Sequence, residues 1–368
     1  MKDSLASYLK TTETELAKPG STVRIAFLDV GQGDTIVMSS PETQEAIIVD
    51  CIDANSVLEY LEQEKITYLR GTILTHLHDD HYSEADDLLN RCQLVPNIRE
   101  CEKLAFRVLN KKHYDILEQD LLEQDADRHH EQGGLDTPEE LKRAKRLRRT
   151  TLQNIREWCL ENRKRHFEPC IQNIIQEDAL EEITPMPLSL QIRGTLAKNI
   201  QLFYPYAIDL YRWGPKGLNN TSVVLRVLGP ASSALLTGDL EPEGWRVLQA
   251  IYPDLHSDIL KFPHHGGAWD TSNTKALLDA VQPSVVVISV GTVGEKYKHP
   301  NKEVFDVLSS PPYSHIRVLC TQATSQCQVA ISDQKQSVIQ CLDQQAGGNG
   351  LKRIGSKRGC PCDGWIKR

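Results

Sequence analysis

The sequence contains no long apolar run. No stretch of its 368 residues approaches the roughly 18 consecutive apolar residues that a membrane-spanning helix needs. The first twenty residues are polar and contain no apolar segment typical of a secretory signal peptide. We therefore expect a soluble, cytoplasmic protein with no membrane partner. The sequence contains no internal repeat, so nothing in it predicts a solenoid.

The sequence also lacks an overall excess of positive charge. Its formal net charge of -8 argues against a protein that coats nucleic acid, although a local basic face can still bind phosphates. Ten cysteines are scattered along the chain. Without a secretory signal, we expect reduced thiols rather than a disulfide scaffold. Cys360 and Cys362 suit free thiols or a weak metal site equally well.

The pattern of apolar residues divides the chain into parts. Residues 1–92 and 188–343 alternate short apolar strands with helical segments, which predicts one layered α/β domain. Residues 93–187 are rich in Glu, Gln, Lys and Arg and predict a charged, helical insertion. Residues 344–368 combine glycines with basic residues and predict a flexible basic tail.

Individual elements follow from the same pattern. Residues 23–30 and 35–38 predict two strands joined by the glycine-rich turn Gly31-Gln32-Gly33-Asp34. Residues 55–64 predict a helix with Asn55 as its N-cap. Further predicted strands are residues 46–51, 66–74, 188–204, 222–228, 234–236, 259–262, 285–290 and 316–320, and further predicted helices are residues 241–251, 274–281 and 302–308.

The strongest chemical signal is His76-Leu77-His78-Asp79-Asp80-His81, directly after the predicted strand 66–74. Side chains at i and i+2 of an extended segment share one side, so His76 and His78 are suited to bind one ion together. The following turn then directs Asp80 and His81 toward a second ion. Two ions about 3.5 to 4 Å apart share and activate one water in many hydrolases.

Two more segments place polar side chains at the ends of apolar strands. Leu236-Thr237-Gly238-Asp239 ends a strand and presents Asp239, a carboxylate suited to bridging two ions. A turn or helix N-cap is the alternative role for Asp239, because a predicted helix follows it. After residues 259–262 come His264 and His265; we favour His265 as a metal ligand and His264 as a catalytic partner, although the sequence permits the reverse.

Together these segments resemble the metallo-β-lactamase superfamily, and within it the branch related to the soluble domain of the competence protein ComEC. The resemblance rests on seven segments in the family's order and leaves out the first twenty residues, the insertion and the tail. They are Leu28 to Asp34, Ile48 to Asp50, Thr75 to His81, Asn219 to Leu225, Leu236 to Asp239, Leu260 to Gly267, and Gly291 to Pro300.

The resemblance implies a four-layer αββα metallo-β-lactamase sandwich with its metal ions at one edge of the paired sheets. Many members carry a third first-site histidine before the aspartate segment, where this chain has Asn219 to Ser222. Members of the ComEC-related branch also lack it, which implies a more weakly bound first ion. No stretch matches the membrane pore of ComEC, so the resemblance does not extend to DNA uptake.

The predicted centre binds two divalent ions, Zn²⁺ or Mn²⁺, because imidazole and carboxylate ligands suit both metals. Asp34 is suited either to orienting a ligand or to forming the turn. His299 is either a general acid or a loop histidine. The predicted ligands are His76, His78, Asp80, His81, Asp239 and His265; the predicted catalytic residues are Asp80, His264 and His299; and Asn219 is a predicted substrate contact.

A local basic segment bears on the substrate. Residues 141–165 contain ten basic and two acidic side chains, and we expect Lys142, Arg146 and Arg149 to contact a phosphate backbone. A solvated helix face or a surface for a protein partner explains the charges equally well. The leading hypothesis is a metal-dependent phosphodiesterase, specifically a nuclease. The alternatives are a hydrolase of a small ester, thioester or nucleotide, and a non-catalytic metal-binding interaction or sensor module.

Overall fold

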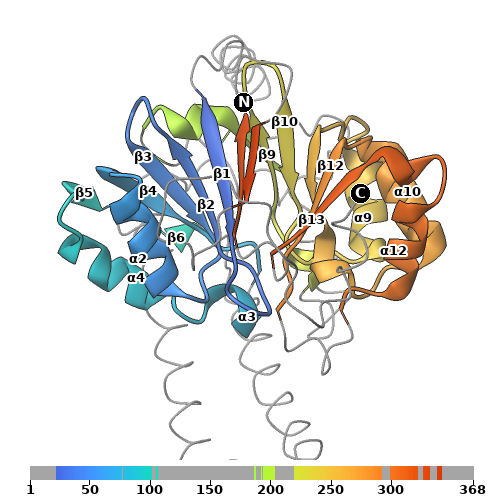
Figure 1. Ribbon diagram of the computed structural model, residues 1–368, viewed down its shortest axis with the longest axis horizontal. Coiled ribbons are helices and arrows are strands. Elements are labelled where there is room, and N and C mark those ends of the chain that lie inside the picture. Colours follow the sequence, from blue (N-terminus) through green and yellow to red (C-terminus); the bar gives the residue numbers. More distant parts are fainter. Residues whose placement is uncertain are drawn as a thin grey trace, which may run out of the picture.

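The computed structural model describes residues 22–76, 78–101, 105–106, 186–187, 192, 194–203, 219–291, 299–321, 326–331 and 338–341. In these residues two β-sheets pack face to face, and helices cover the outer face of each sheet (Figure 1). The predicted α/β architecture of four αββα layers is therefore confirmed.

The first sheet has the strand order β15-β14-β1-β2-β3-β4-β5, with β6 also paired to β4. Its strands are β1 (Val23–Leu28), β2 (Ile36–Ser40), β3 (Glu45–Val49), β4 (Tyr68–Ile73), β5 (Glu100–Cys101), β6 (Ala105–Phe106), β14 (Gln326–Ile331) and β15 (Val338–Cys341). The four strands β1 to β4 were predicted, whereas β14 and β15 were not. Because β14 pairs antiparallel with β1, segments from opposite ends of the sequence meet in this sheet.

The second sheet has the strand order β13-β12-β11-β10-β9-β8-β7. Its strands are β7 (Met186–Pro187), β8 (Ile200–Phe203), β9 (Val224–Leu228), β10 (Ser233–Leu236), β11 (Ile259–Lys261), β12 (Val285–Ile288) and β13 (Arg317–Cys320). From β10 to β13 all neighbours are parallel, so their carboxyl ends share one edge. The single strand predicted over residues 188–204 is wrong in its described part, because η4 (Leu196–Asn199) is a 3₁₀ turn before β8.

Successive side chains along each strand face opposite sides of the sheet, and this alternation explains how the sheets and helices pack in layers. In β1, Ile25 and Phe27 face the core between the sheets, whereas Ala26 and Leu28 face the helices. Successive side chains of a strand point to opposite faces, so a strand buried on both faces is apolar throughout. The core between the sheets and the two cores beneath the helices therefore form from the same strands.

The helices that cover the first sheet are α2 (Ala54–Gln63) and α4 (Ala85–Arg91), and those that cover the second are α9 (Pro242–Ile251), α10 (Thr271–Val281) and α12 (Lys302–Ser309). Short elements are α3 (Asp79–Tyr82), η1 (Cys92–Leu94), η6 (Pro263–Gly266) and η7 (Tyr313–His315). The predicted N-cap Asn55 of α2 is wrong. Asp53 is the N-cap, because its carboxylate accepts a hydrogen bond from the backbone N–H of Ser56 at 3.0 Å.

Part of the predicted insertion belongs to the first sheet. Strands β5 and β6 pair with β4, so the sheet continues beyond residue 93. Residues 107–185 and 342–368 lie outside the described residues, and the boundaries of the insertion and the tail stay predictions. Within the described part of the chain, no helix is long and apolar enough to cross a membrane.

The expectation of reduced thiols is wrong for one cysteine pair. Cys92 in η1 and Cys101 in β5 form a disulfide, with their Cα atoms 6.4 Å apart. The short chain between them turns from α4 back to the sheet edge and brings the two side chains within bonding distance. This disulfide joins the helix layer to the edge of the first sheet.

Candidate metal centre

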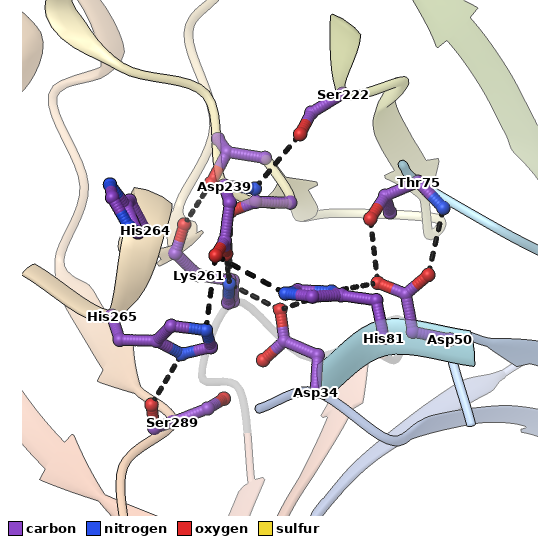
Figure 2. Close-up of polar contacts among 12 residues, drawn as sticks. Asp34, Asp50, Thr75, His81, Ser222, Asp239, Lys261, His264, His265 and Ser289 are labelled. Atoms are coloured by element: carbon purple, nitrogen blue, oxygen red, sulfur yellow. Dashed lines mark hydrogen bonds and ion pairs between the residues drawn. The ribbon is translucent and has the colours of Figure 1, made fainter. Parts of the chain in front are cut away.

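The site lies where several strands end. His76 and His78 follow β4, Asp239 follows β10, and His265 follows β11 within η6. The turn between β1 and β2 brings in Asp34 from the first sheet, which also contains β4, whereas β10 and β11 belong to the second sheet. Figure 2 shows the side chains of Asp34, Asp239 and His265 directed toward one another.

Four buried side chains form the centre: Asp34, His81, Asp239 and His265. One ligand atom of each lies within 4.8 Å of those of the other three, close enough to surround one cation. Atom Oδ2 of Asp239 lies 3.2 Å from Nε2 of His81 and 3.2 Å from Nε2 of His265. The arrangement therefore directs two imidazoles and a carboxylate at one position.

The other ring nitrogens of these histidines already have acceptors. Nδ1 of His81 donates to Asp50 at 2.7 Å, and Nδ1 of His265 donates to the backbone carbonyl of Ser289 at 2.7 Å. Within the described residues, the buried Nε2 atom of each ring contacts Oδ2 of Asp239 at 3.2 Å and has no other hydrogen-bond partner. A neutral imidazole with Nδ1–H engaged presents its lone pair at Nε2, which is the form that binds a metal. The residues therefore fit a divalent cation.

The charges of the centre support the same conclusion. Burial by itself raises the pKa of Asp239, but His265, His81 and Lys261 outweigh it and hold that pKa well below its usual value. Burial lowers the pKa of His81, but the surrounding carboxylates, above all Asp239, hold it well above its usual value. Asp239 is therefore ionised, and a cation competes with protons for the same Nε2 atoms.

His76 and His78 lie beside this cluster. Nε2 of His76 is 3.2 Å from Nδ1 of His78, and the His76 ring centroid is 4.1 Å from that of His81. The i and i+2 spacing therefore brings the two imidazoles together, as predicted. Asp80 lies at the rim, 37% exposed, with carboxylate oxygens 3.9 Å from Nε2 of both His81 and His265.

A second polar group borders the centre and contains Asn219, Glu241, His264 and His299. Nδ1 of His264 is 3.4 Å from Glu241, whose carboxylate accepts a hydrogen bond from Asn219 at 2.9 Å. The ring centroids of His264 and His299 are 5.2 Å apart. Burial lowers the pKa of both histidines. These side chains are suited to contact a substrate next to the cation.

The backbone of η6 separates the two adjacent histidines. His264 and His265 have φ angles of 48° and 50°, which non-glycine residues adopt uncommonly. Two successive left-handed residues direct one ring toward Asp239 and the other toward Glu241. The sequence left the choice of ligand open, and this geometry brings His265 rather than His264 into the cluster.

A glycine allows two backbone segments to approach each other closely at the centre. Gly33 has a φ of 119°, and a Cβ atom there would lie 2.2 Å from the backbone oxygen of Asp80. The neighbouring Asp34 donates its backbone N–H to that oxygen at 3.1 Å. The glycine-rich turn therefore packs directly against the histidine segment, which explains how it brings Asp34 into the centre.

The predicted site residues fall into three groups. His81, Asp239 and His265 lie in the cluster; His76, His78 and Asp80 lie beside it; and Asn219, His264 and His299 lie in the neighbouring polar group. The alternative N-cap role of Asp239 is wrong, because Glu241 is the N-cap of α9. Lys142, Arg146 and Arg149 lie outside the described residues. The roles of all these residues stay predictions.

Three contributors were missed from the sequence. Asp50 accepts from His81, Glu241 contacts His264, and Lys261 contacts Asp34 and Asp239. A signal existed for Lys261, since it is the one charged residue in the apolar run of residues 259–262. For Asp50 the signal was its position directly after a buried strand.

Two known proteins are similar to this chain in sequence. The chain is 24% identical over 316 residues to ComE operon protein 3 of Bacillus subtilis (strain 168), an alignment that covers 81% of this chain and 31% of that protein. It is 39% identical over 87 residues to Competence protein ComA of Neisseria gonorrhoeae, covering 23% of this chain and 12% of that protein. The chain thus spans about a third and about an eighth of these two relatives.

No known family model matches the chain. A solved structure, the metallo-β-lactamase fold protein YhfI from Bacillus subtilis, aligns with a TM-score of 0.36 and 11% identity, over 81% of this chain and 96% of that one. The similarity to ComE operon protein 3 confirms the recognition made from the motifs: this chain resembles the ComEC-related branch of the metallo-β-lactamase superfamily.

Proposed function

We propose that this chain is a metal-dependent hydrolase that acts as a phosphodiesterase, and specifically as a nuclease. The observation that carries the proposal is the position of Asp239, whose Oδ2 lies 3.2 Å from Nε2 of both His81 and His265. Both Nδ1 atoms are held by protein acceptors, so both Nε2 atoms are available to one cation.

His81, His265, Asp239 and Asp80 would hold one divalent ion, and His76 and His78 a second one, with Zn²⁺ and Mn²⁺ as the candidates. Such ions activate water as a nucleophile near neutral pH and stabilise charge on a phosphoryl oxygen. The protein orients its ligands through Asp50 and Ser289 and keeps the centre dry, since the four clustered side chains are buried.

The neighbouring polar group would receive the substrate. His264 and His299 lie on one side of the cluster, and Asn219 is 3.4 Å from Nε2 of His264. We assign His264 as a catalytic partner, His299 as the general acid toward the leaving oxygen, and Asn219 as a substrate contact. Glu241 would keep His264 in place through its contact with Nδ1.

The choice of nucleic acid as the substrate is supported by two facts outside the centre. One is the excess of basic residues over positions 141–165, with Lys142, Arg146 and Arg149 among them. The other is the names of the two relatives, of which one is a competence protein and the other a ComE operon protein. A protein partner for the same basic segment is the alternative explanation of its charge.

The first experiment compares substrates. The purified chain, loaded separately with Mn²⁺ and Zn²⁺, is incubated with DNA, RNA, a generic phosphodiester and a generic ester. We expect cleavage of nucleic acid that Asp239→Asn abolishes and that Asp87→Asn leaves unchanged, since Asp87 pairs with Arg91 on the surface of α4. Cleavage of the small ester alone would instead support a small-molecule hydrolase. No turnover with a bound ion would support a sensor module.

The second experiment tests the basic segment. Replacing Lys142, Arg146 and Arg149 together by Gln should weaken DNA binding and reduce its dependence on salt concentration. The matched control replaces Lys65, Lys198 and Lys275 by Gln, because these three lysines are exposed elsewhere on the fold. Equal effects of both triple variants would contradict a specific role for the basic segment.

A further inference from the structure

Lys261 lies fully buried at the base of the metal centre. Among the described residues it is the only lysine or arginine in the buried class, with 0% exposure. It ends β11, between β10 and β12. Figure 2 shows its ammonium group between Asp34 and Asp239.

The ammonium group makes three contacts. It forms a short ion pair with Oδ2 of Asp34, donates to the backbone carbonyl of Gly238 at 2.9 Å, and lies 3.5 Å from Oδ1 of Asp239. The two carboxylate oxygens of Asp239 therefore have different partners: Oδ1 faces the ammonium group and Oδ2 faces the imidazoles. Lys261 thereby fixes which oxygen is directed at the cation position.

The positive charge of Lys261 compensates the negative charges of buried carboxylates in the site. Asp34, Asp50 and Asp239 are each at most 2% exposed and lie around the same point. Buried carboxylates without a partner are strongly unfavourable, and breaking a buried pair destabilises a protein far more than removing both partners. Without Lys261, the pairing of Asp34 and Asp239 would depend on a bound metal ion and on protonated histidines.

We propose that Lys261 is a permanent internal cation of this centre, a positioning residue that holds Asp34 and Asp239 together before any metal ion binds. The inference rests on the proposed metal-dependent function, because it assigns Oδ2 of Asp239 to the ion. It predicts that the centre is assembled in the metal-free protein. It also predicts that, when the charge of Lys261 is removed, a bound divalent ion partly compensates the negative charges of Asp34 and Asp239 in its place.

Thermal unfolding of the full chain, without metal and with saturating Mn²⁺, tests this role. Lys261→Met keeps the length and apolar stem of the side chain and removes the charge. We expect the Tm of the metal-free variant to fall by roughly 10 °C. We expect Mn²⁺ to raise the Tm of this variant by several degrees more than that of the wild type, because the ion then compensates both carboxylates.

A double-variant cycle covers the case in which Lys261→Met fails to fold. Asp34→Asn with Lys261→Met removes opposite charges together, so the metal-free double variant should fold even where Lys261→Met alone does not, and where both single variants fold its Tm should lie closer to the wild type than the sum of the single changes predicts. Lys302→Met is the control, since Lys302 pairs with Asp306 on the surface of α12 and should change neither measurement.

Either of two results would overturn the role of Lys261. One is a metal-free Lys261→Met protein within about 2 °C of the wild type, and the other is a Mn²⁺-induced rise no larger than that of the wild type. Both leave the proposed hydrolase activity standing. Conversely, a protein without hydrolytic activity that shows the predicted cycle would refute the proposed function and support the role of Lys261.

Discussion

Nδ1 of His81 donates a hydrogen bond of 2.7 Å to the carboxylate of Asp50. The same carboxylate accepts the backbone N–H and the hydroxyl of Thr75, both at 2.7 Å. Asp50 thus links the end of β4 to the histidine segment that follows it. It determines which nitrogen of His81 is directed at Asp239.

Asp50→Asn should weaken metal binding. An amide N–H facing Nδ1 of His81 would favour the proton on Nε2, the atom that binds the ion. We expect the affinity for Mn²⁺ or Zn²⁺, measured by competition with a chelating dye, to fall about 10- to 100-fold. Asparagine tolerates the positive φ of Asp50, 56°, so the fold should persist in circular dichroism. Unchanged affinity would show that the contact with Asp50 is dispensable.

Gly267→Ala should displace His299 without disturbing the backbone. A Cβ atom at this position would lie 2.1 Å from Cε1 of the His299 ring. We expect kcat of the metal-loaded protein to fall about as much as in His299→Ala, roughly 10² to 10⁴-fold if His299 is the general acid. The stability should change by less than about 1 kcal/mol, because a ring can move aside.

Gly31→Ala is the matched control for that glycine. A Cβ atom there would meet nothing within 4 Å, whereas its φ of 82° disfavours alanine. This variant should therefore lose stability and keep its activity per folded molecule. Full activity in Gly267→Ala would exclude His299 from the reaction.

Glu45→Ala should destabilise the contact between the two sheets. Its buried carboxylate accepts the backbone N–H groups of Thr195 and Leu196 at 2.9 and 2.8 Å and pairs with Arg70 at 3.1 Å. We expect a loss of about 3–5 kcal/mol in denaturant unfolding, because buried donors and a buried charge lose their partner. Glu64→Ala, at the partly exposed pair with Arg24, should cost less than about 1 kcal/mol. Similar losses of unfolding free energy in Glu45→Ala and Glu64→Ala would contradict the larger contribution expected from the buried carboxylate.

Reduction of the Cys92–Cys101 disulfide should destabilise the first sheet. The bond closes a short loop, with a sequence separation of 9, for which chain entropy predicts a loss of roughly 2–3 kcal/mol. Cys92→Ser with Cys101→Ser should reproduce that loss and should not respond to reductant. Alkylation and mass spectrometry of protein purified without reductant should find both thiols protected. Two alkylated thiols would restore the original expectation of reduced cysteines and a cytosolic environment.

The sequence predicted the ligand segments because each follows an apolar strand, and parallel strands present their ends at one edge. Asp239 and His265 follow the neighbouring parallel strands β10 and β11, and His81 follows β4 of the facing sheet, so the three side chains meet where the two sheets pack together. Local pattern also predicted β1 to β4 and the helices α9, α10 and α12. These features depend on neighbouring residues in the chain.

Features that depend on distant residues were not predicted. The sequence analysis assigned no role to Lys261, because its partner Asp34 lies in the other sheet and far away in the chain. The choice between His264 and His265 depends on two left-handed backbone conformations, which histidine does not signal. β14 begins with Gln326, Cys327 and Gln328, and its partner β1 lies at the other end of the sequence, so this pairing was not predicted.

The antiparallel pairing of β1 with β14 also means that β1 is synthesised long before one of its two neighbouring strands. Val23 aligns with Ile331, so one side of β1 stays without its neighbour until residues up to 331 have left the ribosome. An unpaired strand edge is prone to intermolecular pairing. A nascent chain that stops before residue 326 therefore exposes the edge of β1, and such fragments should aggregate unless a chaperone shields them.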